Sequence, residues 1–142
     1  MTTEPLDVQD LLTAAQASGW TGFPEAGSIG HVHLQVGGTD AADRFYRDVV
    51  GFDIAADYPG ASFYGSGGYH HQLAGNVWNS RGAGPRKDGC TGLAELQIVL
   101  RETDRLGAIA DAAGKAGLDV AAGGDGLALA DPWGTRIRLT AA

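Results

Sequence analysis

Two histidines stand two residues apart in the stretch GHVHLQVGGTDAADRFY, which begins at Gly30. Imidazole groups bind transition metals and also exchange protons near neutral pH, so His31 and His33 could form a metal site or an acid/base pair. They could equally be two ordinary residues of a strand, because side chains two positions apart share one face of a sheet. The rest of the chain must show which elements position them.

The composition is that of a single soluble globular domain. The chain has 142 residues, of which 44% are apolar and 19% are charged, and this balance favours a folded chain over a disordered one. The formal net charge of −7 argues against nucleic acid and anionic membranes as partners, since both bind basic surfaces. No run of the sequence approaches the ~18 apolar residues of a membrane span.

The N-terminus and the cysteine content predict a cytoplasmic location. The segment MTTEPLDVQD is acidic and lacks the charged-then-apolar layout of a signal peptide. Cys90 is the sole cysteine, so no disulfide framework exists within the chain. It lies in the loop-like segment GPRKDGCTG without an obvious general base beside it, and we do not expect it to be a nucleophile.

The chain contains an internal repeat. Segments TDAADRF, from Thr39, and TDRLGAI, from Thr103, both begin with a Thr-Asp pair typical of a helix N-cap, and each leads into a helical apolar pattern. Strand-like segments flank both helices in the same order. They are 31–36 and 95–100 before the helices, 51–55 and 117–121 directly after them, and 67–75 and 133–141 at the ends. The repeat therefore predicts two βαβββ units, at 30–78 and 92–142.

Residues 1–29 lie outside the repeat. Within LDVQDLLTAAQASG, the residues Leu6, Leu11, Leu12 and Ala15 have helical spacing, which predicts a short amphipathic helix followed by a loop. The segment NVWNSRGAGPRKDGCTG (76–92) has the composition of a connector between the two units. We therefore predict an N-terminal helix and loop at 1–29 and one domain at 30–142.

The doubled unit with GHVHLQV and DAADRFYRDVVGF resembles the vicinal oxygen chelate superfamily of glyoxalases, bleomycin-resistance proteins and extradiol dioxygenases. The stretch GGYHHQLAGNVWNSRGAGP is similar to the catechol 2,3-dioxygenase-like branch, whose members usually contain four such units, so the chain looks like one half. The resemblance implies an α+β fold in which eight strands form an open mixed β-sheet trough with helices outside. It also implies a homodimer, because relatives with two units commonly dimerise.

The resemblance further implies where a metal would bind. Ligands in the superfamily come from the first and last strand of each unit, and these positions hold His31, Gln72, Glu95 and Arg138. Metal-binding relatives often carry glutamate at the position of Arg138, whose guanidinium keeps its charge and repels a cation. We therefore expect a divalent ion (Fe, Mn or Zn) at His31, Glu95 and Gln72 to bind weakly or not at all. Arg138 should pair with Glu95 or an anionic ligand, and Arg138→Glu should strengthen metal binding.

Strand alternation adds further side chains to the concave face of the trough. His33 should share that face with His31, whereas His71 should point the other way as a structural residue. His31, Glu95 and Arg138 are the predicted catalytic residues, as acid/base groups and as the holder of an oxyanion. The predicted substrate-binding residues are His33, Tyr69, His70, Gln72, Trp78, Gln97 and Arg136.

Two functions remain open at this point. The first is an enzyme of the dioxygenase, lyase or isomerase type, with an incomplete metal site, acting on a small polar or aromatic substrate in the trough. The second is a non-catalytic protein of the bleomycin-resistance type that sequesters a drug or metabolite. The enzyme requires a histidine–carboxylate constellation in the trough, whereas the binding protein does not.

Overall fold

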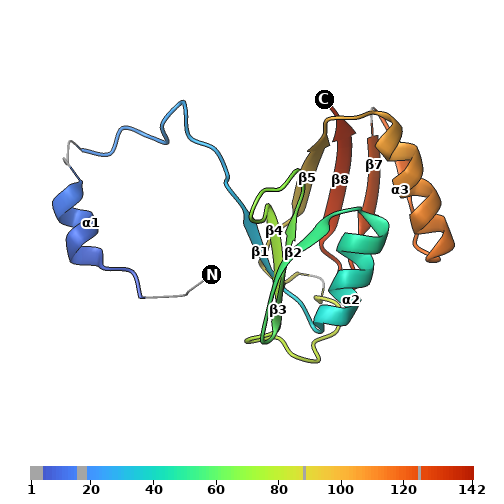
Figure 1. Cartoon of the computed structure of the whole chain (residues 1–142), viewed down its shortest axis with the longest axis horizontal. Helices are drawn as coiled ribbons and strands as arrows, with labels where there is room; N and C mark the ends of the chain where they lie inside the picture. Colours follow the sequence, from blue (N-terminus) through green and yellow to red (C-terminus); the bar gives the residue numbers. More distant parts are fainter. Residues whose placement is uncertain (1–4, 16–18, 88, 125) are drawn as a thin grey trace.

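The computed structural model describes residues 5–15, 19–87, 89–124 and 126–142. Two four-stranded sheets form the body of the molecule, and an N-terminal arm extends away from them (Figure 1). The arm carries α1 (Val8–Ala14), and the body begins at β1 (Val32–Gln35). No helix in the described part of the chain is long and apolar enough to cross a membrane.

The first unit is a strand, a helix and three further strands. After β1 come α2 (Thr39–Asp43), which continues directly as the π-helical segment η1 (Arg44–Val49), and then β2 (Asp53–Tyr58), β3 (Ala61–Gly65) and β4 (Leu73–Asn76). The strand order in the sheet is β1-β4-β3-β2. Strand β1 runs parallel to β4, and the other neighbouring pairs are antiparallel.

The second unit repeats this arrangement. Its elements are β5 (Glu95–Leu100), α3 (Asp104–Lys115), β6 (Ala121–Gly123), β7 (Gly126–Ala130) and β8 (Arg136–Ala141). The strand order is β5-β8-β7-β6, and β5 runs parallel to β8. The predicted α+β class, the two βαβββ units, the open mixed sheets and the N-terminal helix are therefore confirmed.

Two details of the sequence-based expectation are wrong. Backbone hydrogen bonds divide the described strands into two sheets of four, with β1 and β5 in different sheets, and not into one sheet of eight. Alternation within a strand specifies its buried face but does not specify pairing between the two units. In addition, the cap of α2 is Gly38, which makes no side-chain cap bond, and Thr39 is already helical.

A shared hydrophobic core joins the two units. Tyr46 of η1 and Tyr64 of β3 are fully buried in the same cluster as Ile137 and Leu139 of β8. Helix α3 packs against η1 as well as against β7 and β8. The helices thus cover one face of each sheet (Figure 1). We call the opposite face, which carries the candidate site described below, the open face.

One buried hydrogen bond also connects the units. The Tyr46 hydroxyl donates to a carboxylate oxygen of Asp131 at 2.9 Å, and Asp131 lies in the turn before β8. The second carboxylate oxygen of Asp131 accepts from the backbone N–H groups of Trp133 and Thr135. Burial and the adjacent carboxylate raise the pKa of Tyr46, so its hydroxyl remains a donor. The buried carboxylate is thereby satisfied from both units.

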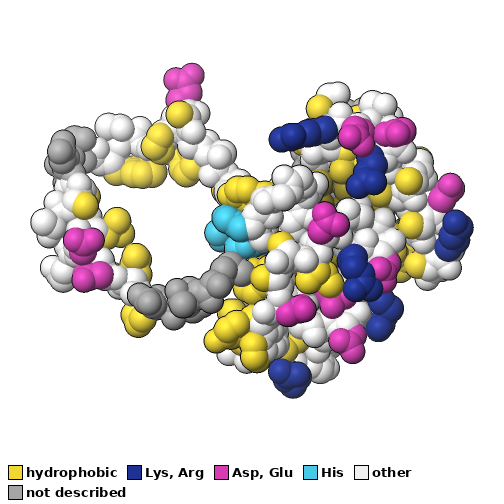
Figure 2. Space-filling view, viewed as in Figure 1, with side chains coloured by type: hydrophobic (Ala, Val, Ile, Leu, Met, Phe, Trp, Pro, Cys, Tyr) yellow, Lys and Arg dark blue, Asp and Glu magenta, His cyan; other side chains and the backbone are white. Residues whose placement is uncertain are grey.

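The described residues of the N-terminal arm lie outside the core. Every described residue from 5 to 31 is exposed, and α1 has no buried residue. Its apolar side chains include Trp20, Ile29 and Leu6, which are 83%, 79% and 72% exposed. Figure 2 shows hydrophobic side chains at several places along the arm.

Candidate functional site

Side chains of β1 alternate between the core and the open face of the first sheet. Leu34 is buried in the core, whereas His33 and Gln35 are exposed on the other side. His33 pairs in register with Ala74 of β4, and Ala74 pairs with Phe63 of β3. Ala74 and Phe63 belong to a small apolar cluster on the open face. The Phe63 ring meets that of His33 edge-on, with 5.9 Å between ring centroids, so His33 rests on an apolar support.

Three histidines come together on this face. His31, His33 and His71 each offer a ring nitrogen, and these atoms all lie within 4.8 Å of one another. The Nε2 atoms of His33 and His71 are 3.2 Å apart, and the ring centroids of His31 and His71 are 4.7 Å apart. Figure 2 shows histidine side chains as one patch on the surface of the body, on the side toward the arm.

We call His31, His33 and His71 the histidine triad. A fourth histidine, His70, lies next to it. The Nδ1 atom of His70 lies 3.1 Å from Nδ1 of His71, and the His70 ring stacks on Tyr69 with 4.1 Å between centroids. Each ring nitrogen of His71 therefore faces a nitrogen of another histidine. A metal-binding histidine commonly donates a hydrogen bond from its second nitrogen, and His70 lies where it can accept one.

The structure places His71 in the site. This corrects the prediction from the sequence that the His71 side chain points to the opposite face. That expectation treated residues 67–75 as one strand, but β4 begins only at Leu73. The preceding segment contains Gly67 and Gly68 with φ of 65° and 76°, so strand alternation does not apply there. The His71 side chain is buried against Phe63, with 5.0 Å between ring centroids. The adjacent pair of histidines was the available signal.

The surroundings of His33 and His71 favour neutral imidazole rings. Burial lowers the pKa of His33, and the nearby His31 lowers it further. The pKa of His71 is also lowered, first by burial and then by His31, His70 and His33. A neutral imidazole has the lone pair that a metal ion requires, because protonation blocks coordination. His33 and His71 are thus suited electrostatically to binding a cation.

The donor set fits a transition-metal ion. Nitrogen ligands lie ~2.0–2.1 Å from zinc, so two ligands of one tetrahedral ion are about 3.4 Å apart. The separation of 3.2 Å between the Nε2 atoms of His33 and His71 is close to this value. Imidazole suits zinc, iron, copper and nickel better than the hard cations magnesium and calcium. His31, His33 and His71 could therefore hold one such ion.

Glu95 and Arg138 form an ion pair on the open face of the second sheet, as the sequence suggested. Arg138 donates from Nε to Glu95 Oε1 at 2.8 Å and from Nη2 to Oε2 at 3.2 Å. The hydrogen bond from Arg138 lowers the pKa of Glu95, and the charge of Arg136 lowers it further. Arg136 lies directly opposite Glu95 in the β5–β8 register. Three of the predicted residues of the second unit, Glu95, Arg136 and Arg138, thus form one charged group.

Three predicted site residues make local hydrogen bonds. The Gln72 side chain accepts from the backbone N–H of Ser66 at 2.9 Å and donates to its carbonyl at 3.3 Å. Gln97 donates to the Thr140 hydroxyl at 3.2 Å, and the Trp78 indole donates to a carbonyl of the β2–β3 turn at 3.2 Å. Gln72 is therefore held by its own loop, and its role as a metal ligand stays a prediction.

Comparison with known proteins identifies the family. Residues 28–139 match the model of the Glyoxalase/Bleomycin resistance protein/Dioxygenase superfamily. The chain is 38% identical over 122 residues to the catechol-2,3-dioxygenase of Bacillus subtilis (strain 168), an alignment that covers 84% of this chain and 43% of the relative. The chain thus spans less than half the length of the curated relative that it matches.

Solved structures share the fold at lower sequence identity. The lactoylglutathione lyase from Agrobacterium tumefaciens has a TM-score of 0.61 at 17% identity, covering 84% of this chain and 96% of that one. A glyoxylase/bleomycin resistance protein/dioxygenase domain from Frankia sp. EAN1pec has a TM-score of 0.65 at 18% identity, with coverages of 82% and 98%. The fosfomycin resistance protein FosX from Mesorhizobium loti has a TM-score of 0.58 at 17% identity, with coverages of 84% and 94%. With the family model and the 38% identical relative, the resemblance seen in the sequence is confirmed, and the chain belongs to the glyoxalase, bleomycin resistance and dioxygenase superfamily.

Proposed function

We propose that this chain is an enzyme of the glyoxalase/extradiol dioxygenase type, with a divalent metal held by His31, His33 and His71. Its substrate is a small polar or aromatic molecule bound on the open face of the sheets. The observation that carries the proposal is the triad, whose three ring nitrogens lie within 4.8 Å of one another. Similarity to a catechol-2,3-dioxygenase supports oxidative chemistry on an aromatic substrate.

The ligand set differs from the one implied by family position. His31 is common to both sets, but His33 and His71 replace Glu95 and Gln72. We favour the triad because Glu95 is engaged by Arg138 through two hydrogen bonds and Gln72 is engaged by its own loop. A ligand set of three imidazoles also avoids placing a guanidinium in contact with the ion.

His70 has a defined part in this arrangement. Hydrogen bonds along the row from His33 through His71 to His70 can run in either direction. If Nδ1 of His71 donates to His70, then Nε2 of His71 carries a lone pair that accepts from Nε2 of His33, and an ion bound by both rings would displace that one proton. In the opposite direction Nε2 carries the proton and cannot bind. His70 therefore positions His71 by accepting from it, as the second nitrogen of a metal-bound histidine commonly requires.

A divalent ion in the triad would supply Lewis-acid polarisation of a substrate oxygen. The remaining roles belong to side chains of the second sheet. Arg136 and Arg138 attract an anionic group of the substrate through charge-assisted hydrogen bonds. Glu95 remains ionised near neutral pH because its pKa is lowered by Arg138, and this suits it to orienting Arg138 more than to accepting a proton.

Metal titration tests the proposal. Calorimetric titration of metal-free protein with Zn²⁺, Mn²⁺ and, under anaerobic conditions, Fe²⁺ should show one tightly bound equivalent for at least one ion. His71→Ala should weaken binding by about 100-fold or more, because loss of a ligand costs at least as much as loss of its orienting partner. Arg138→Glu should leave the affinity unchanged within a few fold.

The opposite pattern has a distinct meaning. A gain of orders of magnitude from Arg138→Glu, with no effect of His71→Ala, would place the ion at His31 and Glu95 as the family position implies. Failure of the wild-type chain to bind any of the three ions would contradict the proposal that it is a metal-dependent enzyme. The bleomycin-resistance type of binding would then be the better description. With metal bound, oxygen consumption on a panel of catechols tests the reaction class.

A further inference from the structure

A cavity of about 300 Å³ lies on the first unit, next to the histidine triad. It is lined by residues of β2, of β3 and of the segment between β3 and β4, namely Asp53, Ala55, Gly65, Gly68, Tyr69 and His70. We call this cavity the Asp53 pocket. Its volume lies at the lower end of the ~300–1,000 Å³ range of small-molecule sites, so it suits an occupant of about one ring with a short side chain.

The shape of the Asp53 pocket is built into the backbone of the first sheet. Gly65 lies in register with Asp53, and a Cβ atom at Gly65 would collide with the carbonyl oxygen of Tyr69. The segment before β4 therefore folds back over the end of β3, and it can do so only because the strand has no side chain there. The register of β2 against β3 also shifts between Ile54 and Ala56, and such irregularities are common next to active sites.

Hydrogen bonds of Gln72 hold the segment that forms the wall of the pocket. The Gln72 side chain bonds to both backbone groups of Ser66, and the Gln72 backbone N–H donates to the carbonyl of Tyr64 at 2.9 Å. The rings of Tyr69 and His70, which lie between these anchor points in the chain, stack on each other with 4.1 Å between centroids. The wall is therefore formed before any ligand binds.

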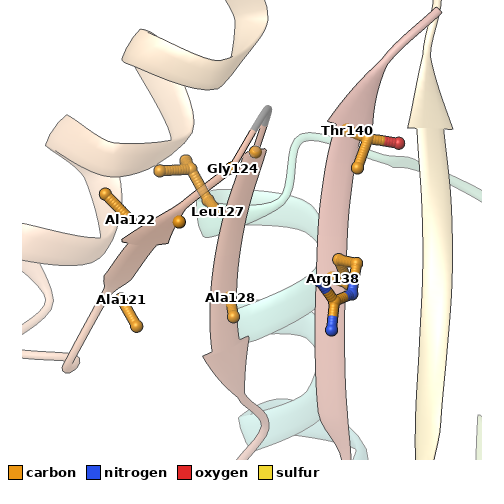
Figure 3. Close-up of a pocket in the computed structure, with 9 residues that line it drawn as sticks. Ala121, Ala122, Gly124, Leu127, Ala128, Arg138 and Thr140 are labelled. Carbon is orange, nitrogen blue, oxygen red and sulfur yellow. The ribbon is translucent and has the colours of Figure 1, made fainter.

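Asp53 gives the pocket a negative charge that is not compensated. The residue is exposed on the open face, because its neighbour Ile54 packs against the core. Within the described part of the chain, no group forms an ion pair or a hydrogen bond with its carboxylate, and no lysine or arginine lines the pocket. By contrast, the cavity along β6, β7 and β8 in Figure 3 contains Arg138, whose charge is already paired with Glu95. Of these two cavities, the Asp53 pocket is the one that offers an unpaired charge to a ligand.

An aromatic ring in the same pocket favours the same kind of ligand. Tyr69 lines the pocket and is 46% exposed. The face of an aromatic ring attracts a cation, and a carboxylate forms a charge-assisted hydrogen bond with an ammonium group. A carboxylate and an aromatic ring in one small pocket therefore select a cationic group over a neutral or an anionic one.

His70 connects the pocket to the triad. It lines the pocket, and its Nδ1 atom lies 3.1 Å from Nδ1 of His71, which is one of the proposed metal ligands. We propose that the Asp53 pocket is the specificity pocket of the enzyme, and that Asp53 selects small aromatic substrates whose side chain carries an ammonium group. This inference rests on the proposed function, because the other end of such a substrate reaches the metal at the triad.

The 2-phenylethylammonium ion is a suitable probe of the pocket alone, with 2-phenylethanol as its neutral counterpart of nearly equal shape. Nuclear magnetic resonance titration of the ¹⁵N-labelled, metal-free full chain should show saturable shifts with the ammonium probe, mainly at amides of β2, β3 and residues 66–72. The alcohol should bind at least about tenfold more weakly, since it has no charge to offer Asp53 and Tyr69. Equal affinities of the two probes, or shifts that do not saturate, would overturn the proposal.

Three variants locate the site. Asp53→Asn should reduce the affinity for the ammonium probe to about that for the alcohol, because it removes the charge and keeps the shape. The matched control is Asp57→Asn, since Asp57 is exposed on the same strand but outside the pocket lining, and it should bind both probes as wild type does. Ala55→Leu fills the pocket and should abolish binding of both probes. Equal effects of Asp53→Asn and Asp57→Asn, or unchanged binding in Ala55→Leu, contradict this location.

A second measurement separates this inference from the proposed function. Zinc has no redox chemistry, so affinities for catechols can be compared on the zinc-loaded protein without turnover. Dopamine should bind at least about tenfold more tightly than hydroxytyrosol, in which a hydroxyl replaces the ammonium group, and Asp53→Asn should remove this preference while leaving the zinc affinity unchanged. Absence of the preference in protein that binds zinc overturns the role of Asp53 and leaves the metal site standing. Absence of binding of any of the three metal ions overturns the proposed enzyme, and with it the pocket as part of that enzyme.

Discussion

The Nε2 atoms of His33 and His71 lie 3.2 Å apart, a distance at which one ring must donate a hydrogen to the other when no ion lies between them. Both rings cannot be imidazolium ions in this geometry, because two N–H groups would then point at each other and two positive charges would be adjacent. Protonation of both rings therefore destabilises the folded arrangement of this pair, whereas binding of a metal ion stabilises it.

The first prediction concerns pH. His33 and His71 have pKa values below the ordinary 6.5 in the folded protein, so the unfolded chain binds more protons as the pH falls through this range. The free energy of unfolding of the metal-free protein is thus fully maintained above pH 6.5 and decreases as the pH drops below that value. Urea unfolding at several pH values between 5 and 8 measures this slope.

The matched variant for this measurement is His33→Gln with His71→Gln. Glutamine keeps hydrogen-bonding groups at both positions but does not titrate. The double variant should therefore show a clearly shallower loss of stability below pH 6.5. An identical slope in wild type and double variant would show that these rings do not carry the acid sensitivity.

The second prediction concerns the link between units. Tyr46→Phe removes the hydroxyl that donates to Asp131 and leaves a buried carboxylate oxygen without this partner. We expect a loss of about 1–3 kcal/mol in the free energy of unfolding, measured by urea denaturation. Tyr58→Phe is the control, since Tyr58 is exposed, and it should change stability by less than ~0.5 kcal/mol. Equal effects of the two substitutions would mean that the buried bond contributes nothing.

The third prediction concerns assembly. We expect a homodimer in which the apolar side chains of the arm are covered, since exposed apolar patches of this kind commonly mark interaction surfaces. Light scattering should report a species of twice the 14.6 kDa chain mass. Leu11→Ser with Leu12→Ser should shift the equilibrium toward monomer, whereas Gln9→Ser on the same helix should not. A single species of chain mass at high concentration counts against the dimer.

The fold was predictable where local signals agree with global structure. Helix periodicity after Thr39 and Thr103, and the apolar strands around them, identify both βαβββ units without reference to distant contacts. The division into two sheets was not predictable, because the residues of β1 and β5 do not indicate whether these two strands pair with each other. Pairing between separate units depends on how the helices pack, which is a property of the whole core.

The site was predictable to the extent that its residues lie on regular strands. Alternation along β1 correctly places His33 on the face opposite Leu34, and the second unit brings Glu95 and Arg138 together. His71 was misplaced because it lies on an irregular segment, where a glycine pair redirects the chain and the period of two is lost. Backbone conformation at such glycines follows from tertiary contacts and cannot be obtained from residue type alone.

The core that the two units share has a consequence for folding. Since Tyr46 and Tyr64 from one unit complete the same cluster as Ile137 and Leu139 from the other, neither unit alone can bury its apolar surface. Amide hydrogens in β3 and β8 should therefore exchange with solvent through one common opening event, with equal protection. If the chain were cleaved in the connector between the two units, at 79–91, the two fragments should remain unstructured apart and regain protected amides only on mixing.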